Sequence, residues 1–212
     1  MSMSATRLIL CRHGESEGNR DGRFGGHGPT ALTERGRAQA QATGLRLRHE
    51  GADAIYCSDL VRARETAELI GQPLSLTPEL TPALRERSVG IFTGLSFAEA
   101  RARYPEQYGV LLQRAPEVAP PQGESYLQCS ARACAFLDQV LARHAGQRVI
   151  VVSHYLTVHL LVLHIMGVAL TREAPRVSVQ LHNCGLHRFE LYDDGAWQVL
   201  ALNDTAHLSA VP

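Results

Sequence analysis

Arginine and histidine side chains follow directly on two strand-like apolar runs of the sequence. The run at residues 8–11 leads into Arg12 and His13, and the run at residues 148–152 leads, after one serine, into His154. Continuous apolar runs of this length are typical of strands that are buried on both faces. Each strand is therefore expected to end by delivering an imidazole, and the first delivers a guanidinium beside it.

Two further charged side chains are expected near the same edge. Arg62 lies one helical turn after the short apolar run at residues 54–57, and Glu86 follows a stretch that prolines interrupt. The carboxyl ends of parallel strands meet at one edge of a sheet, where ligands of such folds bind. The sequence thus predicts one pocket that holds two guanidiniums, two imidazoles and a carboxyl group.

This set of side chains suits phosphoryl transfer. Planar guanidiniums bind phosphate oxygens in pairs, and such transfer depends on stabilising dispersed negative charge. A neutral imidazole is a competent nucleophile, so the reaction can run in two steps through a phosphohistidine. A carboxylic acid then protonates the leaving oxygen and later deprotonates water. Because the arginines and the second histidine supply the positive charge, we expect neither a metal nor another cofactor.

The ten histidines do not suggest a metal site. The sequence contains no HExxH motif, and the pairs His159/His164 and His182/His187 are each five residues apart. That spacing fits neither one face of a helix nor one face of a strand.

Strand patterns alternate with helix patterns along the chain. The expected strands cover residues 7–11, 54–57, 148–152, 177–181, 186–192 and 197–202, with an extended segment at 74–80. The expected helices cover residues 33–49, 60–70, 96–104, 106–114, 124–144 and 155–166, and residues 15–31 are expected to form a loop. This alternation predicts an α/β fold with a mainly parallel sheet and helices on both faces.

The length of 212 residues suits one domain over residues 1–212. Residues 87–122 contain two short helix patterns and a proline-rich connector, so we expect them to form a small helical cap or subdomain. The cap is expected to set the choice of substrate.

Composition and net charge limit the kinds of partner that we expect for this protein. The 21 basic and 21 acidic residues give a formal net charge of zero, which is against a general nucleic-acid binder. The longest apolar stretch, at residues 160–170, is too short to span a membrane, and the N-terminal apolar segment is too short for a signal peptide. The five cysteines form no CxxC motif and are expected to be reduced thiols. We expect a cytoplasmic protein with a small phosphorylated substrate and leave a homodimer open.

Taken together, the motifs resemble those of the histidine phosphatase (phosphoglycerate mutase-like) superfamily. Arg12-His13-Gly14-Glu15-Ser16, with Asn19, resembles the family signature RHGxT/S-x-x-N. Further segments resemble the remaining family motifs in the family's order: residues 29–40 (PTALTERGRAQA), 58–67 (SDLVRARETA), 84–94 (LRERSVGIFTG), 123–125 (GES) and 151–154 (VVSH). The resemblance covers almost the whole chain and implies a phosphoglycerate mutase-like fold.

The resemblance also implies roles for the five residues of the expected pocket. His13 would be the phosphorylated nucleophile, Arg12 and Arg62 would clamp the phosphoryl oxygens, and His154 would donate to them. Glu86 would be the proton donor.

Other positions are candidates for phosphate or substrate contacts, and some depart from the family pattern. Asn19 matches the signature, and His27, Arg87 and Tyr155 are further candidates. Tyr155 stands where the family usually has glycine, and His159 stands where it often has arginine.

The residues favour a metal-independent phosphomonoester hydrolase, a histidine phosphatase that acts on a small phosphorylated metabolite through a phosphohistidine. A phosphoglycerate mutase is the alternative within the family, but residues 87–122 look shorter than the insert of such mutases and lack the paired arginines expected there. A non-catalytic module that binds a phosphate ligand is the alternative from another class. All five residues that the chemistry requires are present in the sequence, which argues against that module.

Overall fold

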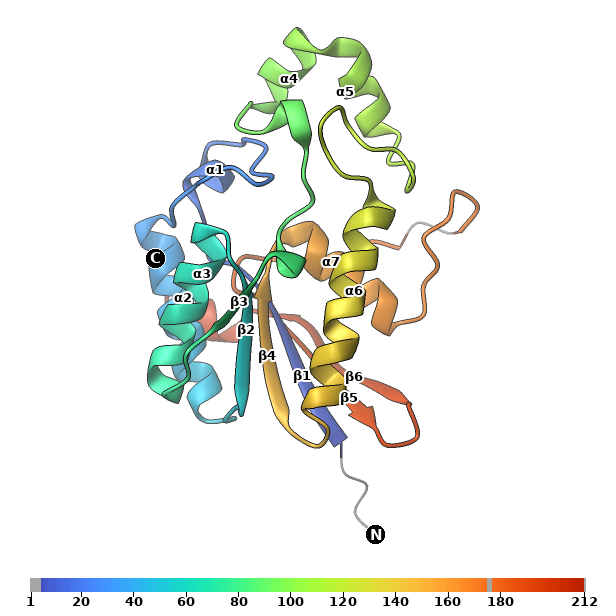
Figure 1. The fold of residues 1–212 in the computed structure, drawn as a ribbon. Helices are drawn as coiled ribbons and strands as arrows, with labels where there is room; N and C mark the ends of the chain where they lie inside the picture. The colour runs from blue at the N-terminus through green and yellow to red at the C-terminus, as the bar shows by residue number, and fades with distance from the viewer. Residues whose placement is uncertain (1–4, 175–176, 212) are drawn as a thin grey trace.

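The computed structural model describes residues 5–174 and 177–211 of the chain. Six strands form one sheet: β1 (Ala5–Arg12), β2 (Ala54–Ser58), β3 (Glu79–Thr81), β4 (Arg148–Ser153), β5 (Leu186–Tyr192) and β6 (Trp197–Asp204). Their order across the sheet is β3-β2-β4-β1-β5-β6 (Figure 1). Strands β1 to β4 are mutually parallel, β5 runs antiparallel to β1, and β6 runs antiparallel to β5. The mainly parallel α/β sheet predicted from the sequence is confirmed.

Helices cover both faces of this sheet. The helices of the described residues are α1 (Glu17–Arg20), α2 (Glu34–Arg48), α3 (Val61–Gly71), α4 (Phe97–Arg103), α5 (Pro105–Leu112), α6 (Tyr126–Arg143) and α7 (Tyr155–Ile165), and the sheet is covered by α2, α3, α6 and α7. Short 3-10 turns add η1 (Gln72–Leu74), η2 (Pro82–Leu84), η3 (Gly90–Phe92) and η4 (Ala206–Leu208). Figure 1 shows α2 and α3 together on one side and α6 and α7 on the other.

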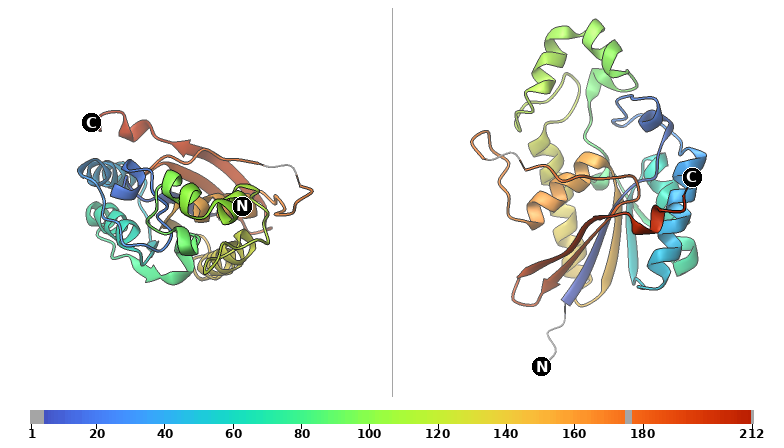
Figure 2. Two further views of the ribbon diagram at one scale, coloured as in Figure 1. Left: turned by 90° about the horizontal axis from the view of Figure 1, so that it is seen from above. Right: turned by 180° about the vertical axis from the view of Figure 1, so that it is seen from behind.

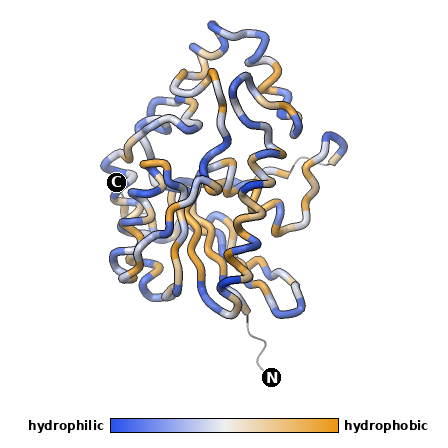
Figure 3. The backbone as a smooth tube through the Cα atoms, in the orientation of Figure 1, coloured by the Kyte–Doolittle hydropathy of each residue, from blue (hydrophilic) through white to orange (hydrophobic). Residues whose placement is uncertain are grey.

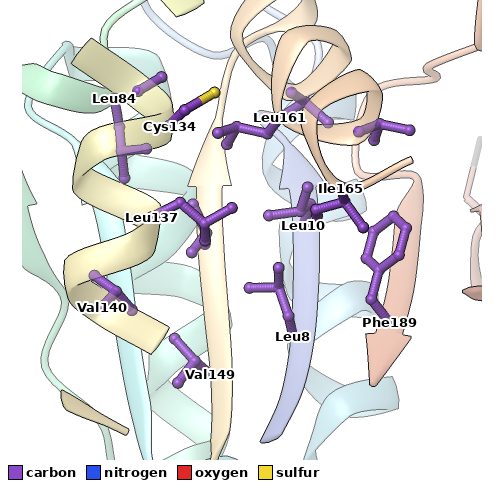
Figure 4. Packing of buried hydrophobic residues seen from close by; sticks show 14 of the residues in the cluster. Leu8, Leu10, Leu84, Cys134, Leu137, Val140, Val149, Leu161, Ile165 and Phe189 are labelled. Carbon is purple, nitrogen blue, oxygen red and sulfur yellow. The ribbon is translucent and has the colours of Figure 1, made fainter. Parts of the chain in front are cut away.

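The alternation of side chains along the central strands explains this layering. In β1, Leu8 and Leu10 belong to the apolar cluster under α6 and α7, shown in Figure 4, whereas Ile9 and Cys11 belong to the cluster under α2 and α3. Because both faces are buried, the central strands are apolar throughout, as the orange core of Figure 3 shows. The predicted thiols are all free and buried, Cys11 among them.

Helices α4 and α5 lie beyond the carboxyl ends of the central strands, apart from the sheet and its flanking helices (Figures 1 and 2). A small separate cluster there has Val89, Phe92 and Ala100 at its centre. Tyr104 and Tyr108 pack against this cluster. The treatment of residues 87–122 as a cap on a single domain remains a prediction.

Two expectations about secondary structure are wrong. Residues 177–181 form no strand and pair with none of the six strands of the sheet. The apolar side chains Val179 and Leu181 are buried by packing on the core instead of by pairing. The glycine-rich loop predicted at residues 15–31 contains the one-turn helix α1, which begins at a capping box that Ser16 forms.

Among the residues that the structure describes, no helix has both the length and the apolar character needed to cross a membrane.

Candidate active site

The pairing of β1 with β4 places the two histidines side by side. Arg12 is in register with Ser153, and the His13 backbone N–H donates to the Ser153 carbonyl at 2.9 Å. The rings of His13 and His154 then meet with their centroids 5.1 Å apart. We call Arg12, His13, Arg62, Glu86 and His154 the strand-end site.

The hydrogen bonds of the His13 ring define its tautomer. Nδ1 lies 2.7 Å from the Gly14 carbonyl oxygen, which only accepts, so Nδ1 carries the ring proton. Nε2 accepts a hydrogen bond from Nε of Arg62 at 3.3 Å. Burial, followed by the charges of Arg62 and Arg12, lowers the pKa of His13 well below its usual value. The ring is therefore neutral near pH 7, with a lone pair on Nε2.

Arg62 is buried and is held by the glycine-rich loop that precedes α2. Its guanidinium donates to the carbonyls of Gly26 and Gly28 at 2.8 and 3.1 Å and to Thr30 Oγ1 at 3.3 Å. Gly26 has a φ of +45°, and a Cβ there would stand 2.8 Å from Val89. Sequence reasoning missed these carbonyl partners, although the run of glycines was a signal that backbone approaches closely here.

His154 occupies the N-cap position of α7, where its side chain makes no capping hydrogen bond, and is fully buried. Its Nε2 lies 2.8 Å from Ser58 Oγ, and its Nδ1 has no partner within the described part of the chain. Burial lowers the pKa of His154 well below its usual value, and the charges of Arg62 and other basic groups lower it further. Ser58 is a contact that sequence reasoning also missed, since only its motif was noted.

Arg12 reaches the site from the last position of β1. One terminal nitrogen of its guanidinium donates to the Leu181 carbonyl at 2.8 Å, and the guanidinium carbon lies 5.2 Å from the centroid of the Tyr155 ring. Burial lowers its pKa, and the charge of Glu86 partly offsets that effect. The tyrosine that replaces the usual glycine thus packs under one of the two arginines.

Backbone groups hold the carboxylate of Glu86. Its two oxygens accept from the backbone N–H of Arg87 at 2.9 Å and of Leu156 at 3.2 Å. The second donor belongs to the first turn of α7, whose N-terminus favours negative charge. Burial lowers the pKa of both Arg12 and Arg62, and the negative charge of Glu86 partly offsets that lowering.

Two further candidates bond to the protein itself. The amide oxygen of Asn19 accepts from the backbone N–H of Ser16 at 3.2 Å in the capping box of α1 and from the Asn183 side chain at 3.2 Å. His27 donates from Nε2 to the backbone carbonyl of Glu86 at 2.7 Å. Both side chains therefore fix loops next to the strand-end site.

Arg87 and Tyr155, the remaining candidates, line a cavity of about 590 Å³ that begins at Glu86, and we call this the side cavity. Arg87 is 6% exposed, and its guanidinium carbon lies 4.4 Å from the centroid of the Tyr126 ring. Within residues 5–174 and 177–211, no group of three or more His, Cys, Asp or Glu side chains is placed to hold a metal ion.

A mainly parallel sheet whose central strands end in two neighbouring histidines beside buried arginines is the architecture of enzymes that transfer phosphoryl groups through histidine. The chain belongs to the histidine phosphatase superfamily (branch 1), whose sequence pattern matches residues 8–205.

Individual relatives include phosphatases and a mutase. The chain is 33% identical over 210 residues to a metal-independent phosphoserine phosphatase of Arabidopsis thaliana, and the aligned region covers 97% of this chain and 84% of that protein. It is 31% identical over 206 residues to a probable phosphoglycerate mutase of Erwinia tasmaniensis, and the aligned region covers 95% of this chain and 94% of that protein. The solved structure of the alpha-ribazole phosphatase from Shigella flexneri is similar with a TM-score of 0.83 and 28% identity, over 93% of this chain and 96% of that chain.

Proposed function

We propose that the protein is a metal-independent phosphomonoester hydrolase that acts on a small phosphorylated substrate through a phosphohistidine at His13. The observation that carries this proposal is the pair of hydrogen bonds on the His13 ring, one from Nδ1 to Gly14 and one from Arg62 to Nε2. Together with burial, they leave a neutral ring whose lone pair is on Nε2. A neutral imidazole in that tautomer can attack phosphorus once Arg62 turns from Nε2 to the phosphoryl oxygens.

In the first step, the Nε2 lone pair of His13 attacks phosphorus, so that a P–N bond forms while the P–O bond to the leaving group breaks. Arg12, Arg62 and His154 donate hydrogen bonds to the phosphoryl oxygens and stabilise their charge. Glu86 enters this step in its protonated form and gives its proton to the leaving oxygen, which departs as a neutral alcohol and leaves Glu86 as the carboxylate.

In the second step, the carboxylate of Glu86 takes a proton from water, and the water oxygen attacks phosphorus. The P–N bond breaks, inorganic phosphate leaves, and the lone pair returns to His13 Nε2. The backbone N–H groups of Arg87 and Leu156 keep the carboxylate in place for both proton transfers.

We assign substrate contacts outside the phosphoryl group to the candidates nearby. Arg87 and Tyr155 line the side cavity, where the leaving group enters next to Glu86. Asn19 and His27 join the contacts when they exchange their internal hydrogen bonds for bonds to the substrate.

Hydrolysis is favoured over a mutase reaction by the segment between Glu86 and the second histidine. A mutase must shield its phosphohistidine from water, whereas here the space next to the acid is a wide cavity of about 590 Å³. Residues 87–122 also lack the pair of neighbouring arginines expected in the mutases. Two relatives named as phosphatases support the same direction.

The test is turnover of p-nitrophenyl phosphate in the presence of EDTA, with trapping of the acid-labile phosphoenzyme. We expect stoichiometric release of phosphate, inhibition by vanadate and no stimulation by added Mg²⁺ or Zn²⁺. Interconversion of phosphoglycerates without release of phosphate would establish the mutase instead. Binding of vanadate without any turnover would establish the non-catalytic module.

We also propose a cytoplasmic location. All five cysteines are free and buried, which suits a reducing compartment. Fractionation of cells followed by detection of the protein tests this, and recovery from an extracytoplasmic fraction would contradict it.

A further inference from the structure

The side cavity is larger than the phosphate of a substrate requires. Its volume of about 590 Å³ adjoins the strand-end site at Glu86 and continues along α7 past Leu160 and Leu163. Cavities of roughly 300–1,000 Å³ hold ligands of drug-like size and are mainly apolar with a few placed polar groups. The leaving group of a three-carbon phosphoester would leave most of this space unfilled.

Aromatic and aliphatic side chains form much of the cavity wall. Phe97 and Tyr155 line the cavity and are 53% and 41% exposed, which is high for large side chains of this kind. Phe24 packs edge-on against Phe97 with ring centroids 4.8 Å apart. Because burying such surface is favourable, an apolar body in the cavity would gain binding energy from these rings.

The same wall carries positive charge that the protein does not neutralise. Four arginines line the cavity, and two of them, Arg23 and Arg172, form ion pairs with glutamates. Among the described residues, neither Arg87 nor Arg114 has a carboxylate within 4.0 Å. Arg87 is nevertheless almost fully buried: one terminal nitrogen of its guanidinium donates to the Glu124 backbone carbonyl at 3.1 Å, and its Nε has no partner among the described residues.

We propose that the substrate is a phosphomonoester with an aromatic or similarly apolar body and a second acidic group. The body lies on the wall that includes Phe97 and Leu163, and the acidic group faces Arg87 and Arg114. This inference rests on the proposed function, because the phosphate of the same molecule must enter the strand-end site.

The proposal is tested with three substrates that differ in one feature at a time. Propyl phosphate has neither an aromatic body nor a second acid, benzyl phosphate has the body alone, and 4-carboxybenzyl phosphate has both the body and a second acid. We expect kcat/KM to rise in that order, with at least about a tenfold gain from the carboxylate, because hydrogen bonds to charged groups contribute about 1.5–3 kcal/mol.

Two variants separate the two parts of the proposal. Phe97→Ala should lower the kcat/KM ratio of benzyl phosphate to propyl phosphate, and Arg114→Gln should lower the ratio of 4-carboxybenzyl phosphate to benzyl phosphate. Arg48→Gln, on the exposed face of α2, is the matched control and should change neither ratio. A preference for propyl phosphate, or ratios that the two variants leave unchanged, would overturn the inference. Failure to hydrolyse any of the three esters would instead overturn the proposed function.

A second inference concerns Ser58 and is carried by a different observation. The Ser58 hydroxyl oxygen accepts from the Leu60 backbone N–H at 3.2 Å and lies 2.8 Å from Nε2 of His154. The other ring nitrogen, Nδ1, is buried without a partner among the residues described. Buried polar atoms without partners are rare and call for an explanation.

The single proton of the Ser58 hydroxyl provides that explanation. When the hydroxyl donates to Nε2, the ring proton must be on Nδ1, and His154 presents a donor instead of a second lone pair. Phosphoryl oxygens in the strand-end site need donors, so only this tautomer stabilises them. We infer that Ser58 is a positioning residue that fixes the tautomer of His154.

The test reads the tautomer directly from the ¹⁵N chemical shifts of the His154 ring with vanadate bound. We expect the Nδ1–H form in the wild type and a mixture of tautomers in Ser58→Ala, with kcat lowered about tenfold to a hundredfold. Ser58→Thr, which retains the hydroxyl, should restore both the tautomer and most of kcat. Ser130→Ala, which removes a hydroxyl on α6, is the control for a general loss of stability. A wild-type tautomer and kcat in Ser58→Ala would overturn the inference.

Discussion

In the strand-end site the reactive side chains lie close to the sheet and are held by backbone groups, whereas the side cavity next to it is lined partly by exposed side chains. The Gly14 carbonyl holds His13, loop carbonyls hold Arg62, and two N–H groups hold Glu86. The cavity wall comes from separate segments, including Phe97 of α4. In the proposed function, the strand-end site carries out the chemistry and the side cavity sets the choice of substrate.

The largest effect is expected when the nucleophile is removed. His13→Ala should lower kcat by at least about 10⁴-fold, because removing one member of a catalytic unit costs nearly as much activity as removing the whole unit. Binding of a non-hydrolysable aryl phosphonate in the side cavity should persist, which calorimetry can measure. Residual activity near the wild-type rate would show that another residue carries the phosphoryl group.

Glu86→Gln should have the next largest effect, about 10²- to 10⁴-fold on kcat for an alkyl phosphate, because the leaving oxygen then departs without a proton. The effect should be smaller for p-nitrophenyl phosphate, whose leaving group needs no protonation. Kinetics of the two substrates side by side are the measurement. If the rate with the alkyl ester were unchanged, the acid would have to be sought elsewhere, although Asp59 already pairs with Arg85.

Buried histidines should also set how the free energy of unfolding depends on pH. Burial lowers the pKa of His187 from 6.5 to about 4, so the unfolded chain takes up a proton in this range while the folded chain does not. This stability is fully present above pH 6.5 and is lost as the pH falls toward 4, by at most about 3.4 kcal/mol at 1.36 kcal/mol per pH unit.

Urea unfolding of the wild type and of His187→Gln between pH 7.5 and 4 tests this expectation. The free energy of unfolding of the variant should depend less steeply on pH. Since the lowered pKa values of His13 and His154 act in the same direction, part of the slope should remain. Equal slopes for the two proteins would contradict the assignment of this histidine.

The smallest effect is expected at the boundary between the two regions. Tyr155→Gly removes the ring under the Arg12 guanidinium, a contact that contributes about 0.5–1 kcal/mol at partly exposed positions. KM for phenyl phosphate should rise by a few fold while kcat changes little. A fall in kcat of more than about tenfold would mean that the tyrosine belongs to the catalytic machinery.

The sequence could predict what depends on strand pairing. Apolar runs before His13 and His154 located both side chains, because parallel strands must end at one edge of the sheet. The bonds that orient them were not predictable, since the Gly26 carbonyl and the Ser58 hydroxyl reach the site through tertiary packing. Residues 177–181 have the alternation of a strand, but they bury Val179 and Leu181 against the core without pairing in the sheet, which only the assembled fold shows. Helix α1 is too short to leave a periodic pattern.

One consequence follows from the hydrogen bond between Arg62 and Nε2 of His13. In the resting enzyme the reactive lone pair is already occupied, and an incoming electrophile must first draw the guanidinium away. A phosphate monoester does so because its charged oxygens accept the hydrogen bonds of the Arg62 guanidinium. Uncharged acylating or alkylating agents carry no such acceptor. The same arginine that binds the phosphoryl group therefore lowers the reactivity of His13 toward reagents that carry no charged oxygen.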